Sequence, residues 1–202
     1  MIRVISDKRL VLGFFLAHLV IFLTFEQQKV FWYFFTAAML LLISYSILDE
    51  SGERNSSKSH LLFGIITGVI LYAVFWLGDT LIGVLNLPLE IQITRLYKLF
   101  SPETVWHYIV LLLVIGPGEE IFWRGFIQRK LHRYTSARTS IIISTLLYAS
   151  VQIYSGEWVL FIAALTGGLV WGALYAWKKS IRLVVISHIV FDLLMFGLLP
   201  LR

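Results

Sequence analysis

Two adjacent carboxylates and a cation lie within an apolar stretch of this chain, where charged side chains are rare. The stretch reads Gly116-Pro117-Gly118-Glu119-Glu120-Ile121-Phe122-Trp123-Arg124. Ionisable groups at membrane depth are costly and mark functional sites. Glu120 and Arg124, four residues apart on a helix, can pair, whereas Glu119 points about 100° away. Glu119 is therefore free to act as a general base or acid. The alternative is an acid-rich helix start with one structural ion pair.

A second pair of polar side chains lies in a later apolar stretch. His188 and Asp192 are four residues apart, so they share one face of a helix. An aspartate this deep needs a partner. We expect Asp192 to orient the imidazole, or both groups to bind a ligand or a metal. The alternative is a structural His–Asp hydrogen bond that holds helices together.

A weaker third feature is Tyr148-Ala149-Ser150-Val151-Gln152, which places a single amide near the end of an apolar run. A lone glutamine there is more typical of a helix–helix hydrogen bond than of a reaction. The small residues Gly167, Gly168 and Gly172 predict close packing of a neighbouring helix.

The composition predicts the kind of protein that positions these groups. Of 202 residues, 58% are hydrophobic and 14% charged, whereas soluble domains are about half apolar and about a quarter charged. We therefore expect an all-α, polytopic integral membrane protein that forms a single domain over residues 1–202. The chain has no cysteine, which excludes disulfides, Cys-zinc sites and thiol nucleophiles.

Seven apolar runs approach the length of about 20 residues that a transmembrane helix needs. They are Leu10–Phe25, Val30–Leu48, Leu61–Leu85, Val105–Ile127, Ser140–Tyr154, Trp158–Trp177 and Ile181–Leu199. The first run ends in a poor cleavage site, so we expect a retained helix. Gly116-Pro117-Gly118 is expected to end one helix, so that Glu119 begins another. A polar loop, Asp49–Lys58, follows the second run, and Asn86–Glu103 is expected to be an interfacial amphipathic helix.

The basic residues predict the orientation of these spans. With a cytoplasmic N-terminus, twelve lie inside and four outside, which follows the positive-inside rule. The inside set is Arg3, Lys8, Arg9, Arg54, Lys58, Arg129, Lys130, Arg133, Arg138, Lys178, Lys179 and Arg182, and the outside set is Lys29, Arg95, Lys98 and Arg202. The pattern indicates a multi-pass protein of a cell membrane, and the net charge of +5 does not indicate nucleic-acid binding.

The three polar features together resemble the CPBP family of intramembrane proteases, which is named for CAAX-processing and bacteriocin-processing proteins and is also called Abi. The family's first motif, Glu-Glu-x-x-x-Arg, corresponds to Glu119-Glu120-Ile121-Phe122-Trp123-Arg124. Its second, Phe-x-x-x-His, corresponds to Tyr148–Gln152, and its third, His-x-x-x-Asn or Asp, to His188–Asp192. The resemblance covers residues 105–199, and the N-terminal spans within residues 10–85 are peripheral to it.

The resemblance implies hydrolysis of a peptide bond in a membrane-embedded or lipidated substrate. In the family, the first Glu and the second-motif His activate a water molecule, which assigns the base to Glu119. The third motif is proposed to stabilise the oxyanion, which assigns His188 and Asp192, and Glu120 and Arg124 would support the site. Some accounts place a divalent metal such as zinc among these groups.

The second motif departs from the family, because Gln152 stands in place of His and Tyr148 in place of Phe. A glutamine donates and accepts hydrogen bonds but is no general base, and losing a proton-transfer group costs about 10²–10⁴ in rate. A second hypothesis is therefore a catalytically impaired member that serves as a binding or bacteriocin-immunity-type protein. A third, transport, lacks the matching pair of interrupted helices that transporter repeats show.

Overall fold

The computed structural model describes residues 6–47 and 59–202, and every regular element within these ranges is a helix. Within these described ranges, six helical segments are long and apolar enough to cross a membrane. They are Lys8–Glu26, Gln28–Ile47, Leu61–Val84, Val105–Tyr134, Trp158–Lys178 and Ile181–Leu198. The prediction of an all-α polytopic membrane protein is confirmed. The predicted loop Asp49–Lys58 lies outside the described residues.

The seventh predicted span is a helix, although a shorter one than the other six. It forms α9 (Ala137–Val151), of 15 residues, followed by the 3-10 turn η4 (Gln152–Ser155). Its polar face is buried, with Ser140, Ser144 and Thr145 packed inside the protein. The polar side chains and the short length explain why this segment is the weakest apolar signal along the chain.

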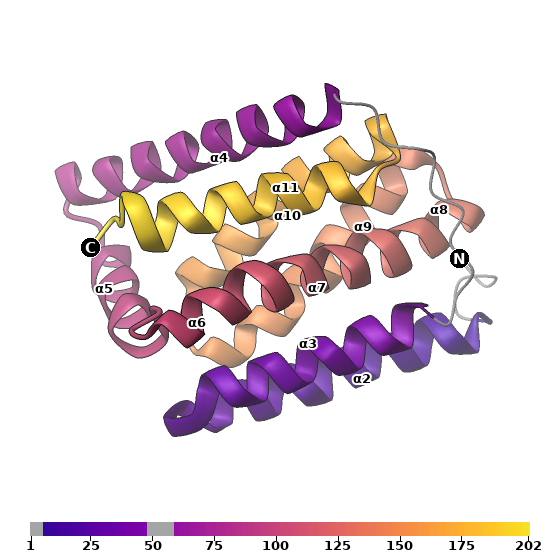
Figure 1. Ribbon diagram of the computed structural model, residues 1–202, viewed down its shortest axis with the longest axis horizontal. Helices are drawn as coiled ribbons and strands as arrows, with labels where there is room; N and C mark the ends of the chain where they lie inside the picture. The colour runs from indigo at the N-terminus through magenta and orange to yellow at the C-terminus, as the bar shows by residue number, and fades with distance from the viewer. Residues whose placement is uncertain (1–5, 48–58) are drawn as a thin grey trace.

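The helices lie roughly side by side, with one short helix across an end of the bundle (Figure 1). Helix α2 packs on α3, α9 on α10, and α4 along α11, which continues into the π-helix η5. Their bounds are α2 (Lys8–Glu26), η1 (Gln28–Val30), α3 (Phe31–Ile47), α4 (Ser59–Val84), α10 (Trp158–Lys178), α11 (Ile181–Asp192) and η5 (Leu193–Leu198).

The segment that carries the two acids is one uninterrupted helix, so the expected stop at Gly116-Pro117-Gly118 is wrong. Its parts are α6 (Val105–Val110), η2 (Leu111–Ile115), α7 (Gly116–Glu120), η3 (Ile121–Gln128) and α8 (Arg129–Tyr134). The segments η2 and η3 are π-helical, and the N–H of Gly116 bonds to the carbonyl of Leu111, five residues back. Such local π-turns re-pair the backbone groups that a proline would leave without partners, so the helix continues through Pro117.

Helix α5 (Leu89–Phe100) runs across the end of the bundle, between α4 and the helix that begins with α6 (Figure 1). It is shorter than the expected amphipathic segment Asn86–Glu103. Arg95 of α5 pairs with Glu157 at 2.7 Å and so ties it to the start of α10. With 12 residues, α5 is shorter than the roughly 20 residues that a transmembrane helix needs, and it is not among the six segments that could cross a membrane.

Asp7 joins the start of α2 to α8. One carboxylate oxygen accepts a hydrogen bond from the N–H of Leu10 at 3.0 Å and caps the helix. The other accepts from Nζ of Lys130 at 2.9 Å and from the hydroxyl of Tyr134 at 3.2 Å. Burial raises the pKa of Asp7, but Lys130 and the Leu10 N–H outweigh it, so the pKa lies below its usual range.

Replacing Asp7 with Asn should destabilise the protein in a pH-dependent way. Asn still caps the helix but loses the charged hydrogen bond, worth roughly 1–3 kcal/mol. Because the folded pKa lies below the unfolded value of about 3.9, this stability is present above that value and is lost as pH falls through the folded pKa. Thermal unfolding in detergent should therefore separate wild type from Asp7→Asn at pH 7, and the gap should narrow as the pH is lowered below about 3.9. A gap that stays constant as the pH falls would contradict the charge-based account.

Candidate active site

Glu120 lies at the centre of the bundle, fully buried, and binds two cations or potential cations. Its Oε1 accepts a hydrogen bond from Nη1 of Arg124 at 3.0 Å. The same oxygen lies 2.8 Å from Nδ1 of His188 on α11. The guanidinium of Arg124 also lies against the rings of Tyr148 and Trp171, at 4.8 and 5.4 Å from their centres. The expected pairing of Glu120 with Arg124 is thus present.

Glu119 faces the other nitrogen of the same imidazole. Its Oε2 lies 3.8 Å from Nε2 of His188 and accepts a hydrogen bond from the hydroxyl of Tyr148 at 3.2 Å. The two acids diverge, as adjacent helical residues must, and the ring of His188 lies between them. The structure therefore brings Glu119, Glu120 and His188 together from two helices, with Tyr148 from a third.

Asp192 does not orient the imidazole, in contrast to one of our expectations. Its Oδ1 lies 3.7 Å from Nε2 of His188, which is too long for a hydrogen bond. Glu120 orients the imidazole instead, because its carboxylate lies within hydrogen-bond distance of Nδ1 of His188 from the neighbouring helix. Gly116 leaves space for the aspartate, since a Cβ there would lie 3.2 Å from Oδ2 of Asp192.

A tryptophan that the sequence analysis missed forms one wall of the site. Trp171 stacks on His188 with ring centres 3.9 Å apart and planes 23° apart. Its Nε1 donates to the hydroxyl of Ser187 at 3.2 Å. The ring of Trp171 therefore covers one face of the His188 imidazole and limits its movement. For this helix, the sequence indicated only close packing at Gly167, Gly168 and Gly172.

Close packing of α4 on α11 fixes the helix that carries His188. A Cβ on Gly68 would lie 2.6 Å from the carbonyl oxygen of Ser187, so only glycine fits. Thr67 donates to the hydroxyl of Ser187 at 3.1 Å across the same contact. The sequence held a signal for this interface, because Gly64 and Gly68 form a G-x-x-x-G pattern in an apolar run.

The site opens into a cavity of about 430 Å³. Glu119, Tyr148, Gln152, His188 and Asp192 all line it, so the three motifs meet on one surface. The rest of the wall is mainly aromatic and aliphatic, and its phenylalanines are Phe25, Phe31, Phe35, Phe75, Phe100, Phe191 and Phe196.

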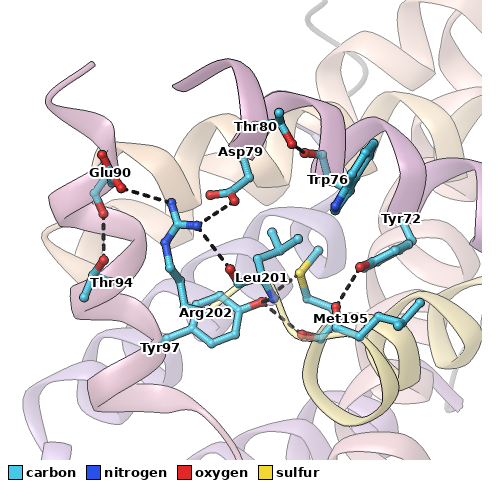
Figure 2. Close-up of polar contacts among 11 residues, drawn as sticks. Tyr72, Trp76, Asp79, Thr80, Glu90, Thr94, Tyr97, Met195, Leu201 and Arg202 are labelled. Carbon is cyan, nitrogen blue, oxygen red and sulfur yellow. Dashed lines mark hydrogen bonds and ion pairs between the residues drawn. The ribbon is translucent and has the colours of Figure 1, made fainter. Parts of the chain in front are cut away.

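Polar contacts edge the cavity at the end of the bundle where α4 meets α5 (Figure 2). Nη1 of Arg202 lies 2.7 Å from Oδ2 of Asp79. The hydroxyl of Tyr97 donates to the carbonyl of Met195 at 2.9 Å and accepts from the N–H of Leu201 at 3.3 Å. Burial raises the pKa of Tyr97 to about 12, so this hydroxyl keeps its proton at neutral pH. These contacts hold the segment after η5 against α4 and α5.

The side chains of the site do not form a metal-binding set. In the described ranges, no three His, Cys, Asp or Glu side chains are arranged to hold a metal ion. Nδ1 of His188 is engaged by Glu120, and the amide of Gln152 is a poor ligand for a transition metal. The donors therefore do not fit the zinc that the resemblance allowed, and no step below depends on a metal.

Comparisons with known proteins place the site in a matched segment. Residues 101–194 match the model of a family described as type II CAAX prenyl endopeptidase Rce1-like. The chain is also 28% identical over 96 residues to an uncharacterized protein of Bacillus subtilis, YpbD, and the alignment covers 47% of each protein. The chain thus matches about half the length of this curated relative. No solved structure matches it significantly.

Replacing Glu120 with Gln should destabilise the protein far more than replacing Glu119 with Gln. The first change leaves the buried guanidinium of Arg124 without its counter-ion, a loss of roughly 3–5 kcal/mol. The hydrogen bond to Glu119 comes from the neutral hydroxyl of Tyr148, which can also bond to an amide, and His188 keeps its shorter contact with Glu120. Thermal unfolding of both purified variants in detergent measures the difference. Similar midpoints for the two variants would show that Glu120 is not the structural acid.

Proposed function

Since residues 101–194 of this chain belong to the CPBP family of CAAX-type membrane proteases, we propose that the protein is an intramembrane endopeptidase with Glu119 as its general base. The observation that carries the proposal is the position of Glu119 opposite Nε2 of His188, at 3.8 Å, on the wall of a cavity within the bundle. A buried carboxylate and an imidazole that face one space have the geometry of acid–base chemistry.

In the proposed reaction, Glu119 removes a proton from a water molecule whose oxygen attacks the carbonyl carbon of the scissile peptide bond. Nε2 of His188 donates a hydrogen bond to the resulting oxyanion. This requires protons on both ring nitrogens, because Nδ1 is bonded to Glu120. The C–N bond then breaks, and the leaving amine takes the proton from Glu119. The hydroxyl of water ends on the new acid and its hydrogen on the new amine.

The other polar groups position the reacting ones. Glu120 and Arg124 hold the ring of His188 from one side, and Trp171 covers its face. The hydroxyl of Tyr148 fixes Glu119. We assign Asp192, 3.7 Å from Nε2 of His188, to binding of the substrate or water beside that nitrogen.

We further propose that the substrate is a membrane-embedded or lipidated peptide that enters from the bilayer. The apolar wall of the cavity favours apolar side chains or hydrocarbon, and the polar groups of the site occupy one part of it. A segment that is already in the membrane reaches such a cavity without first leaving lipid for water.

A second candidate is a family member that binds a membrane partner without cleaving it. The observation that favours it is Gln152, which lines the cavity where the family has a proton-transferring His. The two functions differ in their dependence on Glu119. A binding protein retains its effect when this carboxylate becomes an amide of the same shape.

Replacing Glu119 with Gln should reduce cleavage by about 10²–10⁴, the usual contribution of a general base. The measurement is mass spectrometry of new peptide termini in membranes of cells that produce wild type or Glu119→Gln. Glu103→Gln provides the matched control, because Glu103 is exposed in the turn between α5 and α6. Equal cleavage by wild type and Glu119→Gln would refute the proposed chemistry.

We also propose that the end of the bundle at the start of α2 faces the cytoplasm. Single cysteines at Ala137 and Glu103 test this in a chain without cysteine, because these exposed positions lie at opposite ends of the bundle. In intact cells, an impermeant maleimide should label Glu103→Cys, and it should label Ala137→Cys only after permeabilisation. The reverse pattern would invert the topology.

A further inference from the structure

We propose that Gln152 is a substrate-positioning residue, which hydrogen-bonds the backbone of the peptide in the cavity. The inference deepens the proposed function and rests on it, because it names how the substrate of that site is held. In this reading, Gln152 is a binding group in its own right and not a failed copy of a catalytic histidine.

Gln152 is a buried residue, but its side-chain amide is open to the cavity and has no hydrogen-bond partner within the part of the chain that the structure describes. The residue is 6% exposed, and its only hydrogen bonds come from its backbone, whose carbonyl accepts from the hydroxyl of Ser155 at 2.7 Å. Buried polar groups are nearly always satisfied. Because Gln152 lines the cavity, its amide is free to bond a molecule that occupies the cavity, whether water or substrate.

Most other polar groups on the same wall are already bonded within the described residues, although Oδ1 of Asp79 has no hydrogen-bond partner there. The pairs are Glu119 with Tyr148, His188 with Glu120, Asp79 with Arg202, Tyr97 with the carbonyl of Met195, and Thr166 with the carbonyl of Ile162. Asp192 is an acid near His188 and can only accept when ionised. Gln152 is thus the neutral group of this wall that remains able to donate and accept at once.

An extended peptide in an apolar cavity needs such a group. Each peptide unit carries one N–H donor and one carbonyl acceptor, and both lose their water on entry. A glutamine amide has a matching carbonyl and NH₂, so one side chain can satisfy both. It neither takes nor gives up a proton, which separates this role from that of the histidine in the family's motif.

The local fold places Gln152 one helical turn after Tyr148, the residue that bonds to the proposed base. Helix α9 ends at Val151, and the 3-10 turn η4 turns the chain at Gln152, followed by Gly156 with φ of 75°. Tyr148, one helical turn earlier, holds Glu119 at 3.2 Å. Residues at i and i+4 share a face, so Gln152 binds the peptide one turn away from the attacked carbonyl.

The test measures peptide binding separately from cleavage, in the full-length protein carrying Glu119→Gln to prevent turnover. The probe is a fluorescent, capped pentapeptide of Leu, Val and Phe, and its dissociation constant is read by fluorescence polarisation in detergent. Adding Gln152→Met, which keeps the size but removes the amide, should weaken binding about tenfold, the loss of one to two hydrogen bonds. Adding Ser150→Ala, which alters a hydroxyl bonded to His18 outside the cavity, should leave binding unchanged.

A thermal midpoint separates the binding role from a structural one. Because the amide has no protein partner, Gln152→Met should leave the midpoint unchanged or raise it. A lower midpoint with unchanged binding would identify a structural glutamine and overturn the inference. A probe that no variant binds would overturn it as well.

Cleavage assays then test the role of Gln152 separately from the proposed protease function. In the otherwise wild-type enzyme, Gln152→Met should raise KM about tenfold and leave kcat within a few-fold. If peptide binding depends on Gln152 but no cleavage depends on Glu119, the proposed protease function is refuted and the proposed binding role of Gln152 is retained. If cleavage depends on Glu119 but not on Gln152, the protease function is retained and the binding role of Gln152 is refuted.

Discussion

A single carboxylate oxygen in the middle of the bundle accepts from both a guanidinium and an imidazole. Glu120 makes this contact while fully buried, at 3.0 Å from Arg124 and 2.8 Å from His188. An unpaired arginine at this depth would be costly, and Glu120 neutralises it. The same oxygen holds Nδ1 of His188, so Nε2 is turned towards the cavity. The stacking of Trp171 and the close approach of α4 and α11 maintain this arrangement.

Two adjacent acids therefore have different surroundings and different tasks. Glu120 is enclosed and bonded to both Arg124 and His188, whereas Glu119 accepts a hydrogen bond from the neutral hydroxyl of Tyr148, lies 3.8 Å from His188 and faces the cavity. Enzymes that use paired carboxylates commonly separate their roles in this way, through environment and not through residue type. Tyr148, where the family has Phe, adds a hydrogen bond to the acid that we propose to be reactive.

Local spacing and apolar runs were enough to predict part of this structure. The helical spans follow from hydropathy, and the Glu120–Arg124 pair follows from four-residue spacing on one helix. The bond between Glu120 and His188 could not be predicted, since it depends on how two distant helices rotate against each other. The prediction that the helix ends at Pro117 was wrong for a related reason. The backbone hydrogen bonds are re-formed in π-turns on both sides of the proline, and local sequence does not indicate such turns. Trp171 and the free amide of Gln152 likewise became visible only with the cavity.

Because π-helical turns flank Glu119 and Glu120, the direction in which these two side chains face depends on the number of residues in the turns. A π-turn accommodates one more residue than an α-turn, and one residue of an α-helix corresponds to a rotation of about 100°. A deletion in this part of the helix that the π-turns do not absorb would rotate Glu119 and Glu120 by about 100° relative to the last helix. The direction in which the acid pair faces is therefore set by the number of residues in Leu111–Ile115 as well as by their apolar character.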